Sequence, residues 1–304
     1  MPRSLQPGQT CQIHVVTRTP DGWVDQLLLT TDDVLLEAPN WTIDGSALLL
    51  NGDGVLWRFD LATGVLASLD IDVPELNNDH VLDPDGVHVY LSAMDGHVYR
   101  AAIDGGAATR ATDDRFGDGW FHFLHGVSPA GDELAWIGLR FEQTADNSTA
   151  TIPEVFTTNL TTGEVRQLTN TGRPSDGSEY SPDGEWIYLN TEQFNDVPGA
   201  AQIGRMHRDG SDVEQLTHDD AVNWFPHLSP DDEWAVYISF PTGTLGHPAD
   251  LPVTLKVVHP ADGGWEAPVT TIDLFGGQGT INVNSWSPTS EAFGYVSYPL
   301  GATP

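Results

Sequence analysis

The sequence predicts an all-β protein, a six-bladed β-propeller with four antiparallel strands per blade. Three observations predict this fold. A Ser-Pro-Asp-Gly phrase, intact or altered, recurs about 40 to 58 residues apart, which is the length range of a propeller blade. An apolar strand follows each copy, and no stretch shows helical periodicity. The copies lie at residues 42–45, 83–86, 128–131, 181–184, 229–232 and 287–290.

Each phrase is a type I turn that leads into further strands. Proline fixes φ at the second turn position, aspartate suits the third, and glycine tolerates positive φ at the fourth. A third strand, a second tight turn and a fourth strand then complete the unit. The strands after the turns are expected at 47–50, 87–91, 134–139, 186–189, 234–238 and 292–296, and the five full units at 39–70, 77–112, 121–169, 174–217 and 222–272.

The sixth unit has only its first two strands, at 281–298. The missing pair is at the other end of the chain, at 12–18 and 24–30, joined by a turn at 20–22. We therefore expect the N-terminal strands to complete the last blade, which closes the ring and leaves no free sheet edge. Residues 1–304 then form a single domain without a linker.

The composition describes a folded protein with an acidic surface. Forty-four acidic residues outnumber twelve basic ones, for a net charge of −32, while ten tryptophans and 39% apolar residues can build a core. This balance is typical of proteins from a salt-rich cytoplasm and argues against nucleic acid or anionic membranes as partners. There is one cysteine, and we find no signal-peptide h-region and no apolar run long enough to span a membrane. We expect a cytoplasmic protein.

Polar residues precede the turn phrases, where inner strands surround the central channel. Three imidazoles, a carboxylate and two amides are expected to converge there, two or three positions before each turn. Imidazole nitrogen and carboxylate oxygen suit a divalent metal, and the carboxylate and amides favour Mn²⁺. The alternative is a set of channel-lining residues bound to water or to neighbouring blades. One residue of offset separates His80, His125 and Asn284 from Asn40, Glu179 and His227, so that only one set faces the axis unless bulges intervene.

Long loops favour a pocket at the mouth where the inner strands begin. They are expected at 142–153, 192–201 and 241–251, and rigid scaffolds usually carry binding residues on such loops. Gln278, in a glycine-rich segment, is a further candidate metal ligand. Asn223 and Trp224 begin the inner strand of His227 and are candidate ligand contacts, as are Asn40 and Asn284. Three arginines near the rim could bind a ligand carboxylate, although pairing with surface acids is the alternative: Arg115, Arg140 and Arg173.

The turn phrases resemble those of the TolB-like six-bladed propellers. Three longer phrases, at 125–129, 223–227 and 275–286, are similar to a subgroup related in architecture to oligogalacturonate lyases, which hold a divalent metal with axial histidines. The chain departs from TolB itself, because it shows neither an export signal nor a second domain. No Gly-x-Ser-x-Gly or Gly-rich phosphate motif accompanies the repeats.

Two hypotheses about function follow. The resemblance implies a metal-dependent β-elimination on a uronate or similar acidic carbohydrate, with Mn²⁺ as Lewis acid and an arginine (Arg140 or Arg173) or a histidine on the rim as base. The second hypothesis is a non-catalytic propeller that binds a protein or a small ligand at the same mouth. For the first, the predicted metal ligands are His80, His125, His227, Glu179 and Gln278.

Overall fold

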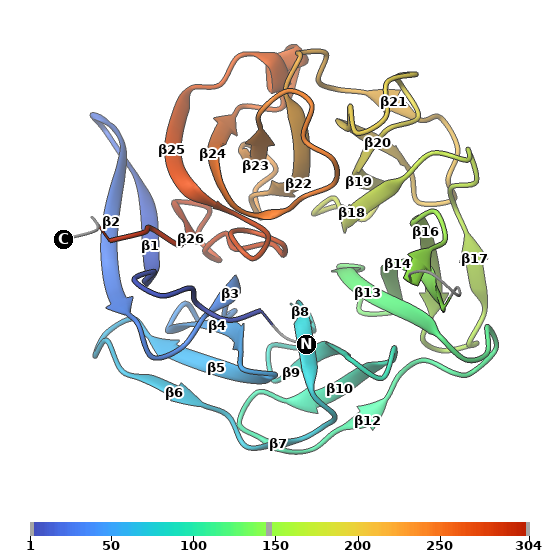
Figure 1. The fold of residues 1–304 in the computed structure, drawn as a ribbon, viewed down its shortest axis with the longest axis horizontal. Coiled ribbons are helices and arrows are strands. Elements are labelled where there is room, and N and C mark those ends of the chain that lie inside the picture. Colours follow the sequence, from blue (N-terminus) through green and yellow to red (C-terminus); the bar gives the residue numbers. More distant parts are fainter. Residues whose placement is uncertain (1–2, 144–147, 302–304) are drawn as a thin grey trace.

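The computed structural model describes residues 3–143 and 148–301, and in it six β-sheets stand around a central axis (Figure 1). The predicted six-bladed propeller is confirmed. From the inner strand outward, blade 1 is β3 (Glu37–Trp41), β4 (Ala47–Gly52), β5 (Val55–Asp60) and β6 (Leu66–Ser68). Blade 2 is β8 (Leu76–Leu82), β9 (His88–Ala93), β10 (Val98–Ala102) and β12 (Thr109–Arg110).

The next three blades repeat this order. Blade 3 is β13 (Trp120–Val127), β14 (Glu133–Gln143), β16 (Glu154–Asn159) and β17 (Val165–Gln167), with β15 (Ser148–Ala150) paired to β14. Blade 4 is β18 (Ser175–Tyr180), β19 (Trp186–Thr191), β20 (Gln202–His207) and β21 (Glu214–Gln215). Blade 5 is β22 (Val222–Leu228), β23 (Ala235–Phe240), β24 (Ala249–Val258) and β25 (Thr270–Gly277), with a 3-10 helix at Ala261–Glu266.

Blade 6 joins the two ends of the chain, as predicted. β26 (Ala292–Ser297) pairs with β1 (Cys11–Thr19), and β1 pairs with β2 (Gly22–Thr31). Its inner strand is reduced to a bridge between Trp286 and Phe293. A two-stranded parallel pair, β7 (Ile71–Asp72) with β11 (Gly106–Ala107), ties blades 1 and 2 at their outer edges.

The core consists of apolar layers between blades. Six clusters of buried apolar residues occupy the six interfaces between neighbouring blades, so each sheet buries both of its faces. Trp136 fills the interface between blades 2 and 3, and Tyr237 fills that between blades 4 and 5. Within the described ranges, no helix is long and apolar enough to cross a membrane.

The channel has two mouths. The inner strands begin at one, which we call the upper mouth, and end in the turn phrases at the other, the lower mouth. The segment before β1 crosses the ring from blade 6 toward the axis (Figure 1). It is held by a bridge between Gln9 and Leu300 and by Asp250, which accepts hydrogen bonds from Gln6 and Gln9.

Candidate functional site

Bulges in the inner strands decide which side chains face the channel. In five blades the pairing register between the inner strand and its neighbour shifts once. A shift of one residue turns a strand side chain to the opposite face. The alternation of inward and outward side chains read from the sequence is therefore interrupted at each bulge. The shifts lie between residues 37 and 40, 76 and 80, 124 and 126, 176 and 179, and 224 and 227.

Three of these bulges contain a left-handed residue at the same place in the repeat. Ala38, Gly177 and Phe225 each lie four positions before the first residue of the turn phrase and have φ of 53°, 65° and 53°. This conformation is rare for a bulky side chain such as phenylalanine and costs about 1–3 kcal/mol. The backbone N–H of Phe225 donates to Asn190 Oδ1 at 3.1 Å, which helps to hold the bulge.

A pocket of about 210 Å³ opens at the upper mouth. Its walls include the aromatic rings of Phe123, Phe141 and Phe225, which come from blades 3 and 5. Its polar residues come from inner strands, from the loop between β23 and β24, and from the segment that follows β25. These polar residues include Asp79, His125, Asp176, His247, Gln278 and Asn282.

His125 is the buried cation of this pocket. Its Nε2 lies 3.2 Å from Asp176 Oδ1, and its Nδ1 lies 3.1 Å from the carbonyl oxygen of Asn282. Both ring nitrogens therefore donate, which requires the imidazolium form. Burial acts to lower the pKa of His125, but the carboxylates of Asp79 and Asp176 outweigh it and raise the pKa to about 9.

The two carboxylates of the pocket differ in their environments. Burial raises the pKa of Asp79 to about 6, and the nearby charge of His125 only partly opposes this. Burial also acts to raise the pKa of Asp176, yet the hydrogen bond from His125 holds it below its usual value. Burial lowers the pKa of His247, so its ring is neutral near pH 7. The pocket thus combines a fixed ion pair with a carboxyl that titrates near neutrality.

Three polar atoms in the lining residues lack partners. Asp79 Oδ1, His247 Nδ1 and Gln278 Oε1 are buried and have no hydrogen-bond partner among the described residues. Buried polar atoms are nearly always hydrogen-bonded, because an unpaired one costs about 1–3 kcal/mol. The concentration of these atoms in the residues of one pocket indicates that a ligand or water completes their bonding.

Arg3 and Glu37 line a neighbouring hollow of about 190 Å³ on the blade 1 side, which shares Asn78 and Gln278 with the pocket. Arg3 donates to the carbonyl oxygen of Gln278 at 2.6 Å, to Glu37 at 3.1 Å and to Asp250 at 3.1 Å. Burial raises the pKa of Glu37 to about 7, against the opposing charge of Arg3. The guanidinium is therefore already matched by two carboxylates.

A second polar layer lies below the pocket. His227 Nδ1 lies 2.5 Å from Glu179 Oε2, and its Nε2 lies 2.5 Å from the carbonyl oxygen of Ile281. Asn284 donates to Glu179 Oε1 at 2.7 Å, and Asn40 donates to the carbonyl oxygen of Asn284 at 2.6 Å. These side chains tie blades 1, 4, 5 and 6 together across the axis, and both ring nitrogens of His227 are occupied.

The segment between Gly279 and Trp286 connects three blades near the axis. Its carbonyl oxygens at Gly279, Ile281 and Asn282 accept hydrogen bonds from blades 1, 5 and 3. Asn282 of this segment also lines the upper pocket. A separate hollow opens at the lower mouth, lined by turn prolines including Pro84, Pro182 and Pro230.

The six residues predicted to converge are divided among three places, which corrects the expectation of one ring. His125 alone reaches the upper pocket, where the predicted Gln278 joins it. Asn40, Glu179, His227 and Asn284 form the lower layer. His80 is wholly buried in the interface between blades 1 and 2, with no partner for either ring nitrogen among the described residues, and burial lowers its pKa to about 3.

The predicted ligand contacts on the rim are mostly engaged elsewhere. Asn223 is buried and bonds to Gln202 and Asp219. Trp224 packs its ring 4.4 Å from that of His247, next to the pocket. The three arginines lie outside the pocket: Arg115 pairs with Asp113, Arg140 donates to the carbonyl oxygens of Phe116 and Asp118, and Arg173 pairs with Asp196.

Several pocket residues were missed from sequence. Asp176 and Asn282 both lie five residues before the first residue of a turn phrase, so extending the comparison by two residues would have found them. Glu37, in the neighbouring hollow, has the same place in its repeat. His247 lies on the loop predicted at 241–251, and its side chain lines the pocket. The loop predicted at 142–153 lies partly outside the described residues. Nothing in the sequence pointed to Arg3.

Known proteins resemble the whole chain. No protein-family model matches it. Atu1656 from Agrobacterium fabrum, an uncharacterized protein, is 36% identical over 296 residues, covering 95% of this chain and 89% of its own length. A solved structure from Agrobacterium tumefaciens, provisionally named TolB, has a TM-score of 0.83 at 33% identity and covers 96% of this chain and 99% of that one. Oligogalacturonate lyase in complex with manganese has a TM-score of 0.54 at 16% identity, over 91% of this chain and 75% of that one, which shows the fold alone.

Proposed function

The chain belongs to the TolB-like family of six-bladed propellers, and we propose that it binds a small hydroxyl-rich ligand of the carbohydrate class in its upper pocket. One observation carries the proposal. Asp79 Oδ1, Gln278 Oε1 and His247 Nδ1 are buried without partners in the described structure and belong to residues of one pocket. Two of these atoms are oxygen acceptors, which suit the O–H groups of a polyol.

The walls of the pocket fit the same class of ligand. The Phe225 ring stacks 5.5 Å from His125 and lines the cavity with Phe123. Aromatic faces beside a few convergent polar groups are typical of small-molecule sites. A neutral ligand is favoured over an acidic one, because His125 and Arg3, the cations nearest the pocket, are already matched by carboxylates.

The predicted Mn²⁺ does not fit the side chains in their present positions. Asp79, Asp176, His247 and Gln278 offer the oxygen and nitrogen donors that Mn²⁺ accepts. However, no three His, Cys, Asp or Glu side chains in the described ranges come close enough to bind one ion, and both nitrogens of His125 are occupied. Mn²⁺ binding stays a prediction that requires these side chains to move.

The predicted lyase reaction and the other partners also stay predictions. Uronate elimination needs a cation for the carboxylate and a base for the neighbouring C–H. His247, neutral and with Nδ1 unpartnered among the described residues, is the side chain best suited to accept that proton. A non-catalytic role with a protein partner and a cytoplasmic location remain equally untested.

Isothermal titration calorimetry with neutral and uronic oligosaccharides, with Mn²⁺ and with EDTA, tests the proposal. We expect neutral sugars to bind without added metal. Gln278→Ala and Asp79→Ala should each weaken binding by about tenfold, since each removes a buried acceptor that is free to bind the ligand. His80→Leu is the matched control, because His80 is buried but lies outside the pocket.

Three outcomes have distinct meanings. Sugar binding that Gln278→Ala and Asp79→Ala leave unchanged would place the ligand elsewhere and overturn the proposal. Binding that disappears in EDTA would support the metal-dependent site instead. Formation of an unsaturated product, seen as ultraviolet absorbance with uronic oligosaccharides, would favour the lyase.

A further inference from the structure

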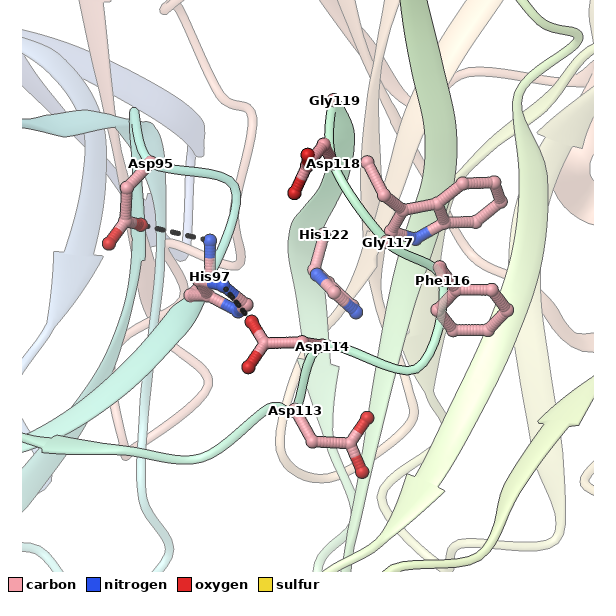
Figure 2. A pocket seen from close by; sticks show the side chains of 10 residues that line it. Asp95, His97, Asp113, Asp114, Phe116, Gly117, Asp118, Gly119 and His122 are labelled. Atoms are coloured by element: carbon pink, nitrogen blue, oxygen red, sulfur yellow. Dashed lines mark hydrogen bonds and ion pairs between the residues drawn. The ribbon is translucent and has the colours of Figure 1, made fainter.

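A second pocket lies between blades 2 and 3, away from the axis. It encloses about 210 Å³ between the turn that follows β9 and the loop that leads into β13. Figure 2 shows four aspartates around it, with His97 and His122 between them. The lining aspartates are Asp95, Asp113, Asp114 and Asp118.

The Nε2 atom of His122, which carries a lone pair, faces this pocket. The side chain is 5% exposed, and its Nδ1 lies 2.7 Å from the carbonyl oxygen of Gly96, so that Nδ1 carries the proton. Burial lowers the pKa of His122 to about 4, so the ring is neutral near pH 7. No hydrogen bond among the described residues involves its Nε2, and Figure 2 shows the ring lying between Asp118 and Asp114.

The carboxylates are only partly neutralised. Asp113 pairs with Arg115, and Asp114 pairs with Arg110 and with His97. Asp118 has no side-chain partner in the part of the chain that the structure describes, and Figure 2 shows its carboxylate directed into the pocket. Two arginines among four aspartates leave the pocket negative.

The loop that carries Asp118 is held in place. Arg140 donates to the carbonyl oxygens of Phe116 and Asp118, and the Phe116 ring stacks 4.4 Å from that of Trp120. These two rings line the pocket with the carboxylates. An aromatic wall beside carboxylates suits a desolvated organic cation, which gains cation–π attraction as well as ion pairing.

We propose that this pocket is a second binding site, which takes a small organic cation with primary ammonium groups. An ammonium donates to the Asp118 carboxylate and to His122 Nε2, and the alkyl part lies against Phe116 and Trp120. A single metal ion fits less well, because no three acidic or histidine side chains of the described residues are close enough to bind one ion. An ammonium ligand of several atoms spans the distance between these groups.

Calorimetric titration of the full chain with putrescine at low salt tests the proposal. Butanediol, of similar shape but uncharged, should not bind, and salt should weaken putrescine binding. Asp118→Asn should weaken it by about tenfold, because it removes a charge-assisted hydrogen bond. Asp32→Asn, at an exposed aspartate in the link between blades 6 and 1, is the matched charge control and should leave affinity unchanged.

The variant His122→Phe tests whether the lone pair on Nε2 contributes to putrescine binding. The variant keeps an aromatic ring against Trp136, whose centroid lies 4.3 Å away, and should weaken putrescine binding as Asp118→Asn does. Since Asp118 is exposed, its variant tests the site even where His122→Phe fails to fold. Equal affinity in wild type and Asp118→Asn would show binding to the acidic surface in general and overturn the proposal. Mn²⁺ binding that Asp118→Asn abolishes, without putrescine binding, would also overturn it.

Discussion

The substitution Gly177→Ala adds one methyl group and tests how tightly the inner-strand bulge of blade 4 is packed. Gly177 has φ of 65°, and a Cβ built there would lie 2.6 Å from Asn190 Oδ1 and 3.1 Å from Phe225 Cδ1. The left-handed conformation costs an alanine about 1–2 kcal/mol. Asn190 Oδ1 would have to move from the Phe225 N–H that it accepts, and an unpaired buried N–H costs about 1–3 kcal/mol more. We therefore expect Gly177→Ala to lower the free energy of unfolding by about 2–5 kcal/mol.

Gly163→Ala separates the two contributions. Gly163 has φ of 69°, but a Cβ there would meet no atom within 4 Å, so only the conformational cost of about 1–2 kcal/mol applies. Urea unfolding followed by tryptophan fluorescence gives both values from the shift of the midpoint at constant slope. Equal destabilisation by the two substitutions would refute the argument that Asn190 and Phe225 brace this bulge.

Three further predictions concern buried charge and salt. The pKa of His125 is about 9 in the folded chain and about 6.5 unfolded, so its contribution to stability is complete below pH 6.5 and is lost as pH rises through 9. The urea midpoint of the wild type should fall as pH rises from about 6.5 to about 9. An equal fall in His125→Gln would show that His125 is not its cause. The pKa of His80 is about 3 in the folded chain and about 6.5 unfolded, so its burial costs stability as pH falls from 6.5 toward 3. The variant His80→Leu should abolish this loss of stability and leave ligand binding unchanged. With a net charge of −32, the melting temperature should rise with KCl, and a flat salt dependence would count against a salt-adapted surface.

The one-residue offset seen in the sequence accounts for much of the division between the polar layers. Asn40, Glu179 and His227 hold equivalent places in their blades, paired with Leu49, Tyr188 and Val236, whereas His80 is one residue earlier and so faces the other way. Counting residues does not place His125, because it is the unpaired residue of the bulge between Leu124 and Gly126. A bulge depends on contacts with the next strand and the next blade, such as the hydrogen bond from Phe225 to Asn190, and these are not local in sequence.

The sequence by itself determined the six blades and the closure of the ring through the N-terminal strands. Turn phrases and strand alternation are local properties, readable within about ten residues, and they repeat six times. Only the tertiary structure decided that His125 faces the upper pocket while His80 is buried between blades. It also placed His247, Arg3 and Asp176 beside the pocket from distant parts of the chain. The physical reason is that a channel-facing position depends on a register shift of one residue, which inter-blade packing sets.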